Sequence, residues 1–98
     1  MGDRVAENRR CRMRAWRRGT REMDLILGPF ADARLSDLPD TDLHLFEQLL
    51  AENDHDLYRW ITARIGAASD GVPPDFGPQP YASLLDGIAQ HASERLRT

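Results

Sequence analysis

The sequence predicts an all-α protein, a compact bundle of five helices in a single domain of 98 residues. Apolar residues recur at the three- and four-residue spacings that place them on one face of a helix. Turn-forming residues separate these stretches, and no stretch shows the two-residue alternation that is typical of a strand. A chain of this length can build one hydrophobic core, so we assign residues 1–98 to one domain.

Five stretches of the chain have this helical pattern. We expect helices at about residues 5–17 and 20–34, a third from Pro39 or Asp40, a fourth that Asp54 caps and Gly66 ends, and a fifth over 81–97. Residues 66–80, which are rich in proline and glycine, are expected to form a loop. Pro29 lies inside the second helix, where it removes a backbone hydrogen bond, so we expect a kink or an early end at Gly28–Pro29.

The apolar faces of the last four helices predict the core. The residues expected to face inward are Met23, Ile26, Leu27, Phe30, Leu43, Phe46, Leu49, Leu50, Leu57, Trp60, Ile61, Ile65, Leu84, Leu85, Ile88, Ala89, Ala92 and Leu96. Trp16 has a weaker apolar setting, and we expect it to be half exposed.

Charge is distributed unevenly along the chain. Residues 1–21 hold eight arginines and two acids, a net charge of +6, whereas residues 22–98 hold five arginines and fourteen acids, a net charge of −9. The basic segment with Trp16 could follow a phosphate backbone, as in a small helical nucleic-acid-binding or antitoxin-type regulator. The acidic remainder would repel a polyanion, so we expect no nucleic-acid partner.

Several other classes of protein are disfavoured. The longest strongly apolar run is residues 25–27, far below the roughly 18 residues of a membrane span, so we expect no membrane insertion. Cys11 is the single cysteine, which excludes an internal disulfide and fits a reducing compartment. The arginine-rich start lacks serine until Ser36, unlike a transit peptide, and we interpret it as part of the folded domain. These features predict a protein of the bacterial cytoplasm.

No pattern of residues indicates catalysis or metal binding. His44, His55 and His91 have no ligand-like spacing with one another or with Cys11. There is no glycine-rich phosphate loop and no nucleophile–base pair in a supporting context. We therefore expect a protein that is not an enzyme, without catalytic, cofactor-binding or metal-binding residues.

The junction of the first two helices, residues 17–24, carries most of the information about function. Its sequence is Arg-Arg-Gly-Thr-Arg-Glu-Met-Asp. One interpretation is structural: Gly19 would be the N-cap of the second helix, and Glu22 would then be its third residue, where a carboxylate favours the exposed amides. The other is that the junction binds a partner. Spacing alone leaves both open.

The segment from Ala15 to Phe30 resembles the succinate dehydrogenase assembly factor family, which comprises the bacterial FAD assembly factor and mitochondrial assembly factor 2. An R-G-x-x-E motif marks that family; Arg18, Gly19 and Glu22 match it, and Asp24 matches an acidic residue that follows. A second family signature resembles residues 46–50 and 54–60. The resemblance covers about residues 8–65, whereas the loop and last helix match only in general character.

The resemblance implies a five-helix protein that binds the flavoprotein subunit of succinate dehydrogenase, and fumarate reductase where that is present. Binding would favour formation of the covalent bond between a histidine of that subunit and FAD. The histidine and the FAD belong to the partner, so this chain needs no cofactor of its own. It would act, as a monomer, by stabilising a reactive arrangement of the partner's domains.

The residues expected to bind the partner are Arg14, Trp16, Arg17, Arg18, Gly19, Glu22 and Asp24. In this interpretation, Arg18 offers two parallel hydrogen bonds to a carboxylate or phosphate, and Gly19 allows the two backbones to approach closely. Glu22 and Asp24 would present carboxylates to cations of the partner.

Overall fold

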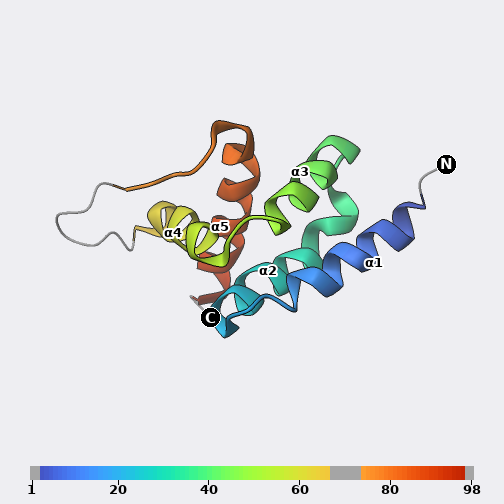
Figure 1. The fold of residues 1–98 in the computed structure, drawn as a ribbon, viewed down its shortest axis with the longest axis horizontal. Coiled ribbons are helices and arrows are strands. Elements are labelled where there is room, and N and C mark those ends of the chain that lie inside the picture. Colours follow the sequence, from blue (N-terminus) through green and yellow to red (C-terminus); the bar gives the residue numbers. More distant parts are fainter. Residues whose placement is uncertain (1–2, 67–73, 97–98) are drawn as a thin grey trace.

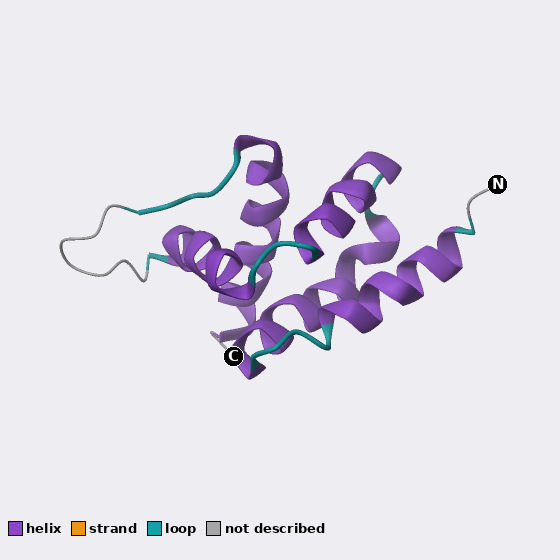
Figure 2. Ribbon diagram, viewed as in Figure 1, coloured by secondary structure: helices purple, strands orange, loops and turns teal. Residues whose placement is uncertain are grey.

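The computed structural model describes residues 3–66 and 74–96, and over these residues it is helical without a strand (Figures 1 and 2). The five α-helices are α1 (Arg4–Ala15), α2 (Arg21–Arg34), α3 (Asp40–Leu50), α4 (Asp54–Ile65) and α5 (Ala82–Leu96). Two 3-10 turns, η1 (Leu35–Asp37) and η2 (Gln79–Tyr81), precede α3 and α5. The predicted all-α class with five helices is confirmed. Part of the expected loop at 66–80 lies outside the described residues. The expected end of the last helix at Arg97 lies outside them as well.

The helices pack mainly as two pairs that share one core. α1 lies along α2, and α4 packs against α5, while α2 and α3 join the two pairs (Figure 1). The link between α1 and α2 lies at one end of the first pair. The C-terminal end of α3 and the N-terminal end of α4 lie beside it. This arrangement brings residues 17–20 next to residues 50–54.

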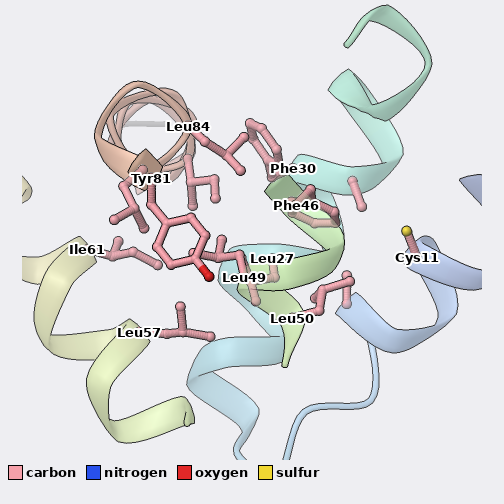
Figure 3. Packing of buried hydrophobic residues seen from close by; sticks show 14 of the residues in the cluster. Cys11, Leu27, Phe30, Phe46, Leu49, Leu50, Leu57, Ile61, Tyr81 and Leu84 are labelled. Carbon is pink, nitrogen blue, oxygen red and sulfur yellow. The ribbon is translucent and has the colours of Figure 1, made fainter. Parts of the chain in front are cut away.

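The core consists of the apolar faces that the helical period predicts. Phe46 and Leu49 of α3 lie at its centre, with α2 on one side and Leu57 and Ile61 of α4 on the other (Figure 3). Almost all of the residues expected to face inward are buried, Trp60 among them; Ile26 and Ile65 are only partly buried. The side chain of Leu96 lies outside the described part of the chain.

Two predicted helix caps are wrong by one residue. Thr20, not Gly19, caps α2, because its hydroxyl accepts a hydrogen bond from the amide of Met23 at 3.3 Å and glycine has no such acceptor. Glu22 is therefore the second residue of α2 and not the third. Asn53, not Asp54, caps α4 by accepting from the amide of His55 at 2.7 Å.

Of the kink or early end expected in α2 at Gly28–Pro29, the early end does not occur, and the kink stays a prediction. The helix continues to Arg34, with Pro29 inside it. Leu27, Phe30 and Ala31 are buried on both sides of the proline, so packing of this segment outweighs the lost backbone hydrogen bond. The expected start of α3 at Asp40 is confirmed, as is the end of α4 at Gly66, whose φ of 89° favours glycine.

Cys11 is buried between α1 and α3. Burial raises the pKa of its thiol, and the nearby carboxylate of Glu47 raises it further. A protonated, enclosed thiol reacts slowly, so Cys11 serves as a small apolar packing residue of α1.

Trp16 fixes how closely α1 and α2 approach. The indole ring lies flat on Gly28 of α2, where a Cβ atom would come within 2.3 Å of the ring. Its Nε1 donates to a carboxylate oxygen of Asp32 at 3.2 Å, and Arg12 pairs with the other oxygen at 3.5 Å. Trp16 is the residue directly before the link 17–20, and its exposure of 39% agrees with the half-exposed position expected. The contact with Gly28 therefore sets where that link begins.

Replacing Gly28 by alanine should destabilise the protein. The added methyl group must displace the indole of Trp16, and overpacking of this kind costs about 1–3 kcal/mol. Gly87→Ala in α5 is the matched control, since its Cβ would meet only Phe30, at 3.9 Å, and alanine favours a helix by about 1 kcal/mol over glycine. Urea unfolding of both variants checks this; a Gly28→Ala variant as stable as Gly87→Ala would contradict it.

Candidate partner-docking site

Arg18 ties the link between α1 and α2 to the connection between α3 and α4. Its Nε donates to a carboxylate oxygen of Asp54 at 2.7 Å. One terminal nitrogen donates to the backbone carbonyl of Leu50, and the other donates to that of Glu52 at 2.8 Å. Each of the three guanidinium nitrogens thus donates one hydrogen bond within the chain, and the side chain is only 11% exposed.

One acceptor of Arg18, the carbonyl of Leu50, is a group that a helix leaves unsatisfied. Leu50 is the last residue of α3, and α3 has no basic residue in its own last turn. A helix C-terminus presents free carbonyls and a partial negative charge, which a guanidinium neutralises. Arg18, which is distant in the sequence, thus supplies the cation that the end of α3 lacks.

The backbone of the link is also held by carboxylates. The amide of Gly19 donates to the second oxygen of Asp54 at 2.9 Å, and the amide of Arg18 donates to Asp24 at 2.6 Å. Charge-assisted bonds of this length are among the stronger hydrogen bonds in proteins. Asp24 and Asp54 together fix the conformation of Arg18 and Gly19.

Tyr81, the last residue of η2, extends this network to the turn before α5. Its hydroxyl donates to a carboxylate oxygen of Glu52 at 2.9 Å, and the carbonyl of Glu52 accepts from Arg18. Burial raises the pKa of Tyr81, and the hydrogen bond to the Glu52 carboxylate raises it further, so the phenol remains a donor at neutral pH. The link is therefore anchored to three other parts of the fold: α2, the α3–α4 connection and η2.

A surface hollow of about 640 Å³ lies between this link and the start of α4. Its lining comes from three places in the sequence: the link, the first turn of α2 and the first turns of α4. The lining residues are Arg17, Arg18, Gly19, Thr20, Glu22, Met23, Asn53, Asp54, His55 and Tyr58. We call it the motif hollow.

The motif hollow presents both signs of charge beside an apolar surface. Arg17 and Glu22 are exposed, and neither side chain forms an ion pair or hydrogen bond within the described chain. Tyr58 is 45% exposed and Met23 lies beneath. Such a mixture of aromatic, apolar and unpaired charged groups is typical of protein interfaces.

The structure brings together some of the residues expected to bind a partner and separates others. Arg17, Arg18, Gly19 and Glu22 line the motif hollow. Asp24 does not line it but bonds the link from within α2.

The two remaining residues, Arg14 and Trp16, lie elsewhere. Arg14 lines a second, adjoining hollow of about 380 Å³ together with Arg10, Met13, Arg17 and Arg18. Trp16 lines neither hollow and packs on Gly28.

Sequence reasoning missed the contribution of α4 to the site. His55 and Tyr58 line the motif hollow, although the sequence showed only that His55 has no ligand-like spacing and assigned no role to Tyr58. A signal was present, because both belong to the segment 54–60 that resembles the second family signature. Tyr58 also follows the buried Leu57, which turns it toward the surface.

The described residues contain neither a metal-site grouping nor a membrane span. Within residues 3–66 and 74–96, no three histidine, cysteine, aspartate or glutamate side chains are grouped so that they could hold a metal ion. No helix in these ranges is long and apolar enough to cross a membrane.

Bacterial and mitochondrial proteins are similar to this chain. It is 33% identical to the FAD assembly factor SdhE of Photobacterium profundum over 94 residues, which are 95% of this chain and 97% of that protein. It is 31% identical to the protein of the same name from Aliivibrio fischeri over 83 residues, 85% of this chain and 86% of that one.

A fungal relative matches a shorter segment. The mitochondrial succinate dehydrogenase assembly factor 2 of Mycosarcoma maydis is 48% identical over 48 residues, which are 49% of this chain and 20% of that protein. No solved structure matches the chain. Residues 9–91 match the family Sdh5, described as the flavinator of succinate dehydrogenase. That match covers most of α1 to α5 and includes every residue of the motif hollow, and the chain therefore belongs to the Sdh5 family.

Proposed function

We propose that this protein is an assembly factor that binds the flavoprotein subunit of succinate dehydrogenase and promotes covalent attachment of FAD to it. One observation carries the proposal beyond family membership. The two segments that resemble family signatures, residues 18–24 and 54–60, are 30 residues apart in the sequence, yet both line the motif hollow. Two recognition segments that converge on one exposed surface are expected of a docking site.

The contacts divide the motif into residues that position the site and residues free to bind. Arg18, Asp24 and Asp54 are occupied by one another and by the backbone. Arg17 and Glu22 have no partner within the described chain and face the hollow. We therefore assign partner contacts to Arg17 and Glu22, and a positioning role to Arg18, whose three guanidinium nitrogens each donate within the chain.

In this proposal the partner supplies the chemistry. The attachment joins FAD to a histidine of the flavoprotein subunit, and the assembly factor is not an enzyme and holds no cofactor. Binding through a rigid surface shifts the partner's population toward the arrangement in which that bond forms. The flavoprotein of fumarate reductase is a second client of the same kind. The buried, protonated thiol of Cys11 fits a reducing compartment such as the bacterial cytoplasm.

Reconstitution with the apo-flavoprotein subunit and FAD tests the function. Adding the protein should increase the covalently bound flavin, seen as in-gel fluorescence at the size of the subunit after denaturation. Deleting the gene should remove that fluorescence in the cell, and the wild-type chain should restore it. Unchanged fluorescence in both experiments would refute the proposed function.

Gly19→Arg should abolish flavinylation and leave the domain folded. A Cβ atom at Gly19 would lie 3.5 Å from a carboxylate oxygen of Asp54, an ordinary contact, so the new side chain can extend into the motif hollow and block the partner. Circular dichroism should show an unchanged helical signal, while flavin fluorescence should be lost. Loss of the helical signal together with activity would assign Gly19 a structural role alone.

Glu22→Gln should reduce flavinylation about tenfold or more, because an interface carboxylate that loses its charge leaves its partner cation unpaired. Glu47→Gln, on α3 and outside the motif hollow, makes the same chemical change and should have little effect. Both variants should unfold at the same temperature as the wild type. Equal losses in the two variants would remove the case for a binding carboxylate at Glu22.

Arg18→Ala should differ from both variants by destabilising the fold. It leaves the carboxylate of Asp54 and the carbonyls of Leu50 and Glu52 without their donor, at a cost of about 2–4 kcal/mol. That is a large share of the roughly 5–15 kcal/mol expected for a domain of this size. Urea unfolding measures it; a variant as stable as the wild type would show that the junction does not depend on this residue.

A further inference from the structure

Eleven of the thirteen arginines of this protein fall into two groups. Five of them form ion pairs with aspartates at 2.7–3.5 Å: Arg4, Arg12, Arg18, Arg59 and Arg64. Six others make no side-chain hydrogen bond or ion pair within residues 3–66 and 74–96: Arg9, Arg10, Arg14, Arg17, Arg21 and Arg34. The unpaired group is concentrated on α1 and the link that follows it.

Three of the unpaired arginines surround the second hollow, which has a volume of about 380 Å³. Arg10, Arg14 and Arg17 line it, and Met13 lies among them with 48% of its surface exposed. No acidic residue lines it. Glu7, one turn before Arg10, forms no ion pair with it in the described chain. We call this surface the Met13 hollow.

Within the isolated chain, the charges of Arg10 and Arg14 repel each other and no carboxylate of the described residues pairs with them. Arg10 and Arg14 are four residues apart on one helix, and like charges at that spacing destabilise a helix by roughly 0.2–0.5 kcal/mol. An exposed methionine beside them adds apolar surface that only a partner can cover. Five other arginines pair with an aspartate, whereas Arg10, Arg14 and Arg17 lie together around one hollow without such a partner in the described chain.

We propose that the Met13 hollow is a second docking site, which binds an acidic segment of the flavoprotein subunit. Carboxylates of that segment would pair with Arg10 and Arg14, and an apolar side chain would cover Met13. The site is continuous with the motif hollow, because Arg17 and Arg18 line both. The identity of the partner rests on the proposed function, whereas the chemistry of the segment follows from the hollow itself.

The surroundings favour an acidic protein segment over a nucleic acid. The carboxylate of Glu22 in the neighbouring hollow, which is unpaired within the described chain, and the net charge of −3 on the molecule both disfavour a polyanion here. Methionine is enriched at protein interfaces and gives a phosphate nothing to bind. Arginine in turn pairs with a carboxylate through two parallel hydrogen bonds.

Arg14→Glu is the direct test, with Arg34→Glu as a matched control. Both arginines are exposed and unpaired within the described chain, and each lies in the last turn of its helix, so both changes have the same effect on net charge and a similar one on the helix end. Calorimetric titration of the apo-flavoprotein subunit should show binding about tenfold or more weaker for Arg14→Glu, and within about twofold of the wild type for Arg34→Glu. Raising the salt concentration should reduce the difference in affinity between the two variants, because salt screens the charges.

The apolar part of the site has its own pair of variants. Met13→Ala should weaken binding of the subunit several-fold, because the variant buries less apolar surface in the complex. Val5→Ala should leave binding unchanged. Val5 is also on α1 and is 69% exposed, but it lines neither hollow. Circular dichroism on all four variants should show the wild-type helical signal.

The outcomes separate the two proposals. If the wild-type protein does not bind the subunit, the proposed function fails. If it binds and Arg14→Glu equals Arg34→Glu, the Met13 hollow is not a docking site and the proposed function stands. If duplex DNA binds the wild type as tightly as the subunit does, and Arg14→Glu abolishes this, the hollow is a nucleic-acid site and the inference is overturned.

Discussion

The guanidinium of Arg18 is the interaction on which the geometry of this protein's exposed surface depends. It closes the end of α3, pairs with the first residue of α4 and belongs to the link between α1 and α2. Arg4 does the corresponding work at the other end of α1, donating to the carbonyls of Leu35 and Leu38 and pairing with Asp40 at 2.7 Å. The two arginines therefore bond to groups at both ends of α3. Because Arg4 begins α1 and Arg18 follows its end, the length of α1 sets the distance between them.

This arrangement explains why one short motif contains both structural and exposed residues. In the proposed function the R-G-x-x-E segment exposes groups for binding, yet the short link between α1 and α2 has little structure of its own. Arg18 supplies that structure by bonding to parts of the fold more than thirty residues away. The contact of Trp16 with Gly28 fixes the other end of the link. Glu22 and Arg17 can then be held in place while their side chains remain free.

The fold could be predicted from sequence because its core is built from helical faces with a regular period. Where the prediction was wrong, two neighbouring residues could each fill a role and only tertiary contacts decided between them. Asp54 is as good a cap as Asn53 by type, but in the structure its carboxylate holds Arg18 and Gly19. Pro29 likewise breaks a helix in isolation and is tolerated inside a buried one.

About half of the candidate site could be predicted in the same way. The family resemblance pointed to Arg18, Gly19 and Glu22. His55 and Tyr58 belong to the site because the start of α4 lies against the link, and this tertiary contact cannot be inferred from the sequence. The role expected of Arg18, binding an outside carboxylate, could not be distinguished from an internal one by residue type. A guanidinium serves both equally, and the structure shows acceptors for it within the chain, at Leu50, Glu52 and Asp54.

The distant acceptors of Arg18 also limit how small a working version of this protein can be. A synthetic peptide of residues 15–30 would contain the whole R-G-x-x-E motif but none of the groups at Leu50, Glu52 and Asp54 that shape it. Such a peptide would sample many conformations and lose the entropy of ordering on binding. The recognition unit is thus a discontinuous one: it cannot be transplanted as a linear tag, and an inhibitor that imitates it would need a scaffold in place of α3 and α4.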